Sequence, residues 1–407
     1  PNAPIKFDNI HLETNFAGWN LYGRGNKIVI GENVTTESGE LFRIYGGSDT
    51  NNSTTGCPTN VVVESGNWHL VCGGGHGDIP NGTTVTVRGD ANITTLYGGG
   101  TERSTVGTPD GQNTDVNIHV EGGNIDYLYG GNRVEKEGCA IYEDINIEVT
   151  GGHVGILCAG NDYSHVDNPE EWEESFVQGN VTVSIKNGGS ATQVIGDPYH
   201  TAYTRSVKGS TILECYVDEK FNMLDQWDVV RIIGDGTPNS TTVETLDTTG
   251  GKYIGRIEVT NGGRLYMDMN GYINVLNEKD QILKPLNDGS TPYELKHAWQ
   301  GESTEERRNL STLAIEGAAI TPSGNYYFDQ DEGKAGLRIK GNVEGFSTLD
   351  ACGTPMYSTG DTYYYYVVAD SSDNGGKAFR EPEGAPYVVC YRYLEDGRIG
   401  WYLRERP

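Results

Sequence analysis

Hydrophobic and polar residues alternate in short runs along most of the chain. In the stretch VNIHVEGGNIDYLYGGN (116–132), Val116, Ile118 and Val120 alternate with polar residues. Two glycines follow, and a second apolar run ends at two more glycines. Alternation with a period of two is typical of a β-strand that buries one face. The stretch therefore predicts two short strands, each followed by a glycine corner.

The same pattern recurs seven times. The second apolar run is found at 41–47, 68–74, 93–99, 125–131, 154–160, 191–197 and 229–235. We call the residue before the small or glycine pair the anchor; the anchors are Tyr45, Cys72, Tyr97, Tyr129, Cys158, Ile195 and Ile233. The residue before each anchor is always aliphatic and is predicted to point inward: Ile44, Val71, Leu96, Leu128, Leu157, Val194 and Ile232. The residue two before the anchor varies, as at Arg43, and is predicted to point outward.

The repeat length indicates how the strands are organised. Successive anchors lie 25 to 38 residues apart, and a unit with two short strands cannot bury its apolar side alone. Stacked units bury a continuous core, so the sequence predicts an all-β fold, a right-handed parallel β-helix or solenoid. The alternative is an antiparallel β-sandwich with turns at similar spacing, which does not require the same inward position in seven consecutive units.

Changes in the pattern divide the chain into four segments. Residues 1–30 are predicted to form an N-terminal cap, and residues 31–276 the β-helix repeats. Residues 277–309 are polar with scattered prolines and indicate an insertion or linker. Residues 310–407 are predicted to be terminal strands and a C-terminal β cap, because a solenoid needs a cover over its last open edge.

The repeats carry a resemblance to a known architecture. Repeats of the form V-x-I-x-V-x-G-G followed by L-Y-G-G-G resemble the right-handed parallel β-helices of surface proteins from gut Firmicutes. That architecture is shared with pectin-lyase-like enzymes and autotransporter passengers. The resemblance covers about residues 30–275. It implies a fold and not an activity, because this architecture carries lyases, hydrolases, adhesins and stalks.

Composition and charge narrow the possible partners. The chain has 57 glycines and 25 tyrosines but only 4 methionines, which suits turns and strands better than helices. The formal net charge of −27 disfavours nucleic acid and anionic membranes as partners, and it is compatible with bound Ca²⁺. The sequence has no apolar run long enough to span a membrane.

The cysteines predict a redox environment. Two of the seven occupy anchors, and each has another cysteine in the loop that leads into its repeat. This coincidence predicts disulfides, and disulfides indicate an extracellular or cell-surface location. The alternative is that small inward thiols pack in the core. The predicted pairs are Cys57–Cys72, Cys139–Cys158 and, as a third candidate, Cys352–Cys390, which leaves Cys215 single.

Polar and aromatic residues follow each anchor. In stacked repeats, equivalent loop positions lie about one strand spacing apart along one edge. Polar loops on a rigid scaffold often carry function, although a solvated edge without function is the alternative. The predicted ligand-binding residues along this edge are Arg103, Arg133, Asp162, Tyr163, His165, Asp197, Tyr199 and His200.

The leading hypothesis from these features is an adhesin-like, non-catalytic protein, secreted or on the cell surface, that binds glycans or host glycoproteins through tyrosines and tryptophans. A polysaccharide lyase or glycoside hydrolase is the alternative, with Arg103 or Arg133 acting beside Asp162 and Asp197. The chain has no H-E-x-x-H motif, no G-x-S-x-G motif and no phosphate-binding loop, so no specific catalytic class is indicated. A structural stalk is a third hypothesis.

Overall fold

The protein is all-β throughout the part of the chain that the structure describes. The computed structural model describes residues 4–13, 19–37, 42–49, 58–111, 114–135, 138–164, 175–197, 206–237, 239–245, 252–268, 273–275, 294–297, 312–316, 337–352, 355–360 and 363–407. These residues form strands and one short 3₁₀ helix, and they contain no α-helix. The chain divides into two compact units, of which the first contains Pro1–Ile212 and the second contains Leu213–Gln281 and Asn287–Pro407.

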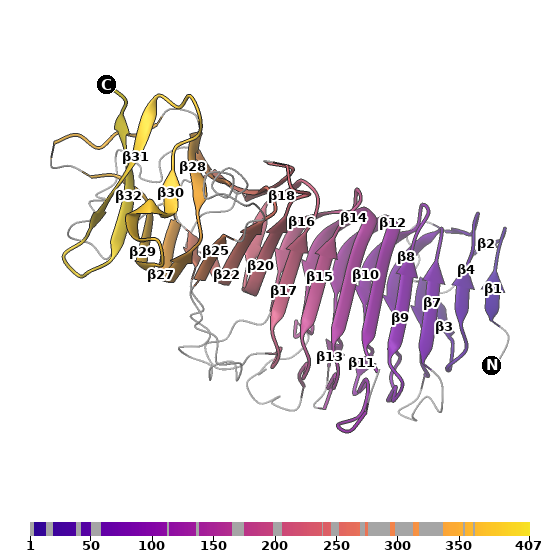
Figure 1. Cartoon of the computed structure of the whole chain (residues 1–407). Coiled ribbons are helices and arrows are strands. Elements are labelled where there is room, and N and C mark those ends of the chain that lie inside the picture. Colours follow the sequence, from indigo (N-terminus) through magenta and orange to yellow (C-terminus); the bar gives the residue numbers. More distant parts are fainter. Residues whose placement is uncertain are drawn as a thin grey trace. The chain divides into compact units, whose positions relative to one another are not determined.

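The first unit contains a column of parallel strands, the first column. In Figure 1 these strands, coloured indigo to magenta, run side by side. Each strand pairs in register with the next, as in Val85↔Ile118 and Ile118↔Ile147. The members are β1 (Ile5–Phe7), β4 (Ile28–Ile30), β7 (Thr59–Val63), β9 (Thr83–Val87), the first parts of β12 (Val116–Tyr129) and β14 (Ile145–Cys158), and β15 (Val181–Ile185).

A second column of parallel strands carries the anchors. It contains β3 (Trp19–Tyr22), β6 (Phe42–Tyr45), β8 (Asn67–Cys72), β10 (Asn92–Tyr97), the second parts of β12 and β14, and β16 (Ser190–Ile195). The inward ladder predicted from the sequence is confirmed here. Its members are fully buried and pair in the order Ile44, Val71, Leu96, Leu128, Leu157 and Val194. Ile232 belongs to the second unit, where it is also fully buried and pairs with Val259.

Glycine follows the anchors because the repeats approach each other closely at this corner. A side chain at Gly73 would collide with the backbone oxygen of Gly98, and one at Gly98 with that of Gly130. The hydroxyls of Thr59 and Thr83 donate to the carbonyl oxygens of Gly73 and Gly98, at 2.6 and 2.7 Å. The glycine corner is therefore required by backbone contact between neighbouring repeats and not by flexibility.

Short pairings complete the first unit. β2 (His11–Leu12) pairs with β5 (Thr35–Thr36), and β11 (Thr101–Glu102) pairs with β13 (Arg133–Val134). Both pairs are parallel. A line of single-residue parallel bridges precedes the return to the first column, and its members are all fully buried: Ile79, Val106, Ile141, Val177 and Val207.

The second unit has two sets of parallel strands. β17 (Thr211–Cys215) begins at the end of the first unit, and β19 (Met223–Asp225) is a further short strand of the second. One set contains β20 (Trp227–Ile233), β22 (Lys252–Thr260), β24 (Ile273–Val275), β25 (Glu294–His297), β27 (Leu337–Glu344) and β29 (Tyr365–Ser372). The other contains β18 (Glu219–Phe221), β21 (Thr241–Thr245), β23 (Gly263–Asp268), β26 (Thr312–Glu316), β28 (Ser347–Cys352) and β30 (Phe379–Arg380).

The chain ends in antiparallel strands. β32 (Ile399–Glu405) pairs antiparallel with both β29 and β31 (Tyr387–Tyr393). The turn of the β31–β32 hairpin contains Gly397, whose φ of +90° favours glycine. Trp401 is fully buried, and its Nε1 donates to the carbonyl of Gly376 at 3.0 Å, in the 3₁₀ helix η2 (Gly375–Ala378).

The predicted disulfides are wrong. Cys72, Cys158 and Cys390 are free thiols, so none of the pairs Cys57–Cys72, Cys139–Cys158 and Cys352–Cys390 forms. The reason is register, because each thiol lies opposite a residue that is not cysteine. Cys72 pairs with Tyr45 and Tyr97, Cys158 with Tyr129 and Ile195, and Cys390 with Tyr402. The thiol of Cys139 donates to the backbone carbonyl of Glu102.

Candidate functional site

Many outward residues of the second column are buried, although they point away from the inward ladder. We call this outward side, with the loops that follow the anchors, the covered face. The buried residues Tyr45, Leu70, Cys72 and Tyr97 form a hydrophobic cluster there, and Tyr22 and Tyr129 pack against it. The rings of Tyr22 and Tyr45 stack with centroids 4.8 Å apart, and those of Tyr97 and Tyr129 stack at 5.2 Å. The covered face therefore buries a column of aromatic rings on a surface that strand alternation alone would leave open.

A histidine and a glutamate lie over one end of the aromatic column. The His76 ring lies 5.2 Å from that of Tyr45 and 5.9 Å from that of Tyr22. Its Nδ1 lies 2.9 Å from Glu102 Oε1, and its Nε2 lies 3.4 Å from the Tyr22 hydroxyl. One side chain thus connects residues of four successive repeats.

The buried carboxylate of Asp162 lies at the other end of the aromatic column. The Tyr97 hydroxyl donates to Asp162 Oδ2 at 2.6 Å, and the Ser164 backbone N–H donates to Oδ1 at 2.9 Å. Asp162 is 4% exposed. Burial and the neighbouring Asp162 carboxylate raise the pKa of Tyr97, so this phenol stays protonated.

Two arginines bring positive charge to the covered face. The charges of Arg43 and Arg133 both act on Tyr45, Cys72 and His69. Burial raises the pKa values of Tyr45 and Cys72, whereas burial and the two arginines lower the pKa of His69. At neutral pH the three groups are therefore uncharged, and they place no counter-charge beside the guanidinium groups.

The Nε atoms of these arginines share a feature with that of Arg264 in the second unit. Both are buried, and neither has a hydrogen-bond partner in the described part of the chain. Arg133 forms an ion pair with Glu135 through its terminal nitrogen, at 2.8 Å. Its side chain is 28% exposed.

The structure brings several predicted site residues together. The backbone of Arg133 pairs with that of Asp162, and Tyr163 follows directly. Arg103 is exposed, one residue beyond β11. His165, Tyr199 and His200 lie outside the described residues. Ligand binding by the predicted set stays a prediction.

The buried members of that set have internal partners. Asp197 is fully buried, and its carboxylate accepts hydrogen bonds from Ser206 Oγ at 2.6 Å and from the Ser206 backbone N–H at 3.1 Å. Tyr163 is 9% exposed, and its hydroxyl donates to the backbone carbonyl of Ser175. In this conformation both side chains present little surface to a ligand.

Sequence reasoning did not include Arg43, His76 or Tyr97 among the site residues. The signal for Arg43 was present, because the residue two before an anchor points to the same side as the anchor. Burial of that side was not foreseen. Two asparagines that follow anchors are buried, and their side-chain oxygens accept backbone N–H groups of the preceding repeats: Gly100 N–H to Asn132 and Asn132 N–H to Asn161, both at 2.8 Å.

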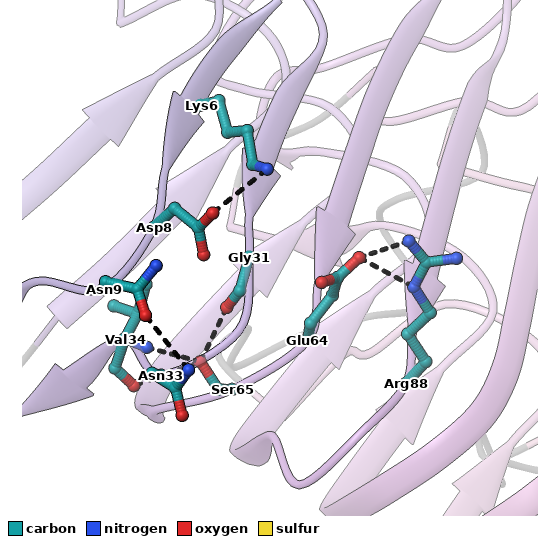
Figure 2. A network of polar contacts seen from close by, with 9 residues as sticks. All are labelled: Lys6, Asp8, Asn9, Gly31, Asn33, Val34, Glu64, Ser65 and Arg88. Carbon is teal, nitrogen blue, oxygen red and sulfur yellow. Dashed lines mark hydrogen bonds and ion pairs between the residues drawn. The ribbon is translucent and has the colours of Figure 1, made fainter.

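A second candidate lies at the corner that follows the first column. An open depression of about 490 Å³ is lined by Glu32, Asn33, Glu64, Arg88, Gly89 and Asp90. Figure 2 shows its polar network, in which the Arg88 guanidinium contacts Glu64 and the Asn33 amide donates to Asn9. Lys6 pairs with Asp8 at 3.2 Å in the same network. Because its one arginine is already paired, this corner is the weaker candidate.

The described ranges contain no group of three or more His, Cys, Asp or Glu side chains that could hold a metal ion. A Ca²⁺ site therefore stays a prediction from the acidic composition.

No family model, curated protein or solved structure matches the chain. Among the residues that the structure describes, no helix has the length and apolar character needed to cross a membrane.

Proposed function

We propose that the protein is a secreted or cell-surface binding protein that holds a glycan, or the glycan of a host glycoprotein, along the covered face. We further propose that its parallel columns wind as a right-handed β-solenoid like those of bacterial surface proteins. The in-register pairing of both columns supports this winding, because each strand pairs with the strands of its two neighbouring repeats.

One observation carries the proposal. A single row of outward residues crosses the second column in register: Arg43, Leu70, Thr95, Tyr127, Ile156 and Gln193. Tyr127 is 42% exposed, whereas Tyr45 and Tyr97 of the same face are buried. Three strand spacings separate Arg43 from Tyr127, which is roughly 14 Å. The row thus offers an exposed ring and a cation to one extended ligand.

The polar groups of the face favour binding over catalysis. Asp162 is held by Tyr97 and Ser164, and Glu135 is held by Arg133. A glycoside hydrolase needs two carboxyl groups free to act on one bond. The engaged carboxylates of the covered face do not provide that pair.

Glycan-array binding, followed by titration of the best ligand, tests the proposal. Tyr127→Ala is expected to cost more than about 1 kcal/mol of binding free energy, because exposed aromatic rings are common binding anchors. Tyr393→Ala is the matched control, since Tyr393 is 59% exposed on the C-terminal hairpin. Equal loss in both variants, or no binding to any glycan, contradicts the proposal. Release of reducing or unsaturated sugars would instead indicate an enzyme.

A further inference from the structure

We propose that Arg43 and Arg133 form a binding site for an oxyanion, namely the carboxylate or sulfate group of an acidic glycan. The inference rests on the proposed function and names the class of glycan. It is carried by the two buried Nε atoms that lack a hydrogen-bond partner in the described residues. An arginine Nε–H can only donate, so an acceptor is the one kind of group that satisfies it.

The absence of a partner for Arg43 contrasts with the rest of the chain. Many other arginines contact a carboxylate: Arg24 with Asp49, Arg88 with Glu64, Arg231 with Glu214 and Glu258, Arg398 with Asp396, and Arg406 with Glu381. The chain has 57 acidic residues against 30 basic ones. Arg43 has no ion pair with a described residue although its Nε atom is buried, and burial of an unpaired donor is unfavourable.

Arg43 and Arg133 differ in their ion pairing. Four carboxylates act on Cys72 or on the tyrosines of the covered face, and three of them contact a basic side chain. Asp49 pairs with Arg24, Glu102 with His76, and Glu135 with Arg133. Tyr45, Cys72 and His69 are neutral at pH 7, as shown above. Arg43 forms no ion pair with a described residue, and the fourth carboxylate, that of Asp162, accepts hydrogen bonds from Tyr97 and Ser164.

The chemistry of the guanidinium group sets the ligand class. Its Nε–H and one terminal N–H lie on one edge and donate in parallel to two oxygens of a carboxylate or sulfate. A neutral sugar hydroxyl lacks both the charge and the paired oxygens. Burial of the two Nε atoms strengthens the attraction, because water screens it less.

Titration with inorganic sulfate and, separately, acetate tests the site without any glycan. The Nε–H resonances of Arg43 and Arg133 in ¹⁵N-labelled protein are expected to shift with sulfate, acetate or both, and Arg43→Gln and Arg133→Gln assign them. The anion that shifts them distinguishes a sulfated from a carboxylated source. If neither anion moves either resonance, the site is overturned, whatever glycan the protein binds.

Binding of matched oligosaccharides completes the test. We expect Arg43→Gln to weaken binding of an acidic oligosaccharide at least tenfold and to leave a neutral one of equal length unchanged. Arg24→Gln is the control, because it also removes one positive charge but from an arginine that is already paired with Asp49. We expect it to change the affinity for the acidic oligosaccharide less than twofold. Equal binding of neutral and acidic oligosaccharides overturns the inference and leaves the proposed function standing. If neither oligosaccharide binds but sulfate still shifts the arginine resonances, the proposed function is contradicted and the oxyanion site stands.

Discussion

The outer sides of the two columns have the same alternating sequence pattern but different surroundings. On the first column, Thr84, Asn117 and Asn146 pair in register, and the Asn146 amide donates to Asn117 at 3.3 Å. Asn146 is exposed. On the second column, Tyr45 and Tyr97 occupy outward positions and are 4% and 3% exposed. Alternation therefore determines which side a residue faces, and only the neighbouring loops decide whether that side reaches solvent.

The loops explain the difference. The segments after the anchors bring His76, Glu102 and Asp162 over the tyrosines, and each contributes a polar contact to them or to one another. The corner after the first column contains a tight turn with Gly89 at φ +66°. Asn146 on the first column is consequently left in water, and the candidate site forms where the loops fold back.

The largest expected effect is on the inward ladder of the second column. Leu128 is fully buried and pairs with Leu96 and Leu157. Leu128→Asp places an unpaired charge in this packed ladder and is expected to lower the free energy of unfolding by about 3–5 kcal/mol. Urea unfolding followed by circular dichroism measures the loss.

The open face of the first column provides the control for that experiment. Asn146→Asp introduces the same carboxylate at an exposed position and is expected to change stability by less than about 0.5 kcal/mol. Comparable losses in Leu128→Asp and Asn146→Asp would show that the two sides of the strands are not different environments.

A smaller effect is expected within the covered face. Tyr97→Phe removes the hydroxyl that donates to the buried Asp162 carboxylate, at an expected cost of about 1.5–3 kcal/mol. Tyr129→Phe is the matched variant, because the Tyr129 hydroxyl has no hydrogen bond to the described residues. Its expected change is below about 0.5 kcal/mol. If Tyr97→Phe unfolds at the same urea concentration as wild type, the hydroxyl does not support the fold.

The smallest expected effect concerns the rate at which thiols are alkylated. It is measured by comparing thiols on the covered face with one on the open face. Burial raises the pKa of Cys72, and it raises that of Cys158 to about 12. Because the thiolate is the reactive form, both should resist iodoacetamide at pH 8 in the folded protein. Asn146→Cys places a thiol on the open face, which should be alkylated fully in the same time.

Site-resolved mass spectrometry measures this protection. After denaturation without reductant, Cys72 and Cys158 should both become alkylated, because neither is part of a disulfide. If Cys72 and Cys158 resist alkylation in denatured, unreduced protein, they are part of disulfides, as the sequence predicted. Rapid alkylation in the folded state would show that the covered face is open.

The ladder and the corners could be predicted because they depend on short-range rules. An aliphatic residue before each anchor has to face inward in every repeat, and the register of Leu96, Leu128 and Leu157 confirms it. Glycine after the anchor could likewise be read as a corner. The backbone contact between Gly73 and Gly98 that requires it became visible only in the structure.

The sequence by itself determined the period of the repeats, the inward ladder and the strong negative charge, because alternation and composition are properties of neighbouring residues. Only the tertiary structure decided that Cys72 lies between tyrosines, that Tyr97 meets Asp162 from 65 residues away, and that Arg43 lacks a carboxylate. These outcomes depend on register between repeats and on loops folding over a strand face. Contacts of that kind join residues whose separation follows no fixed spacing, so a pattern read along the chain does not contain them.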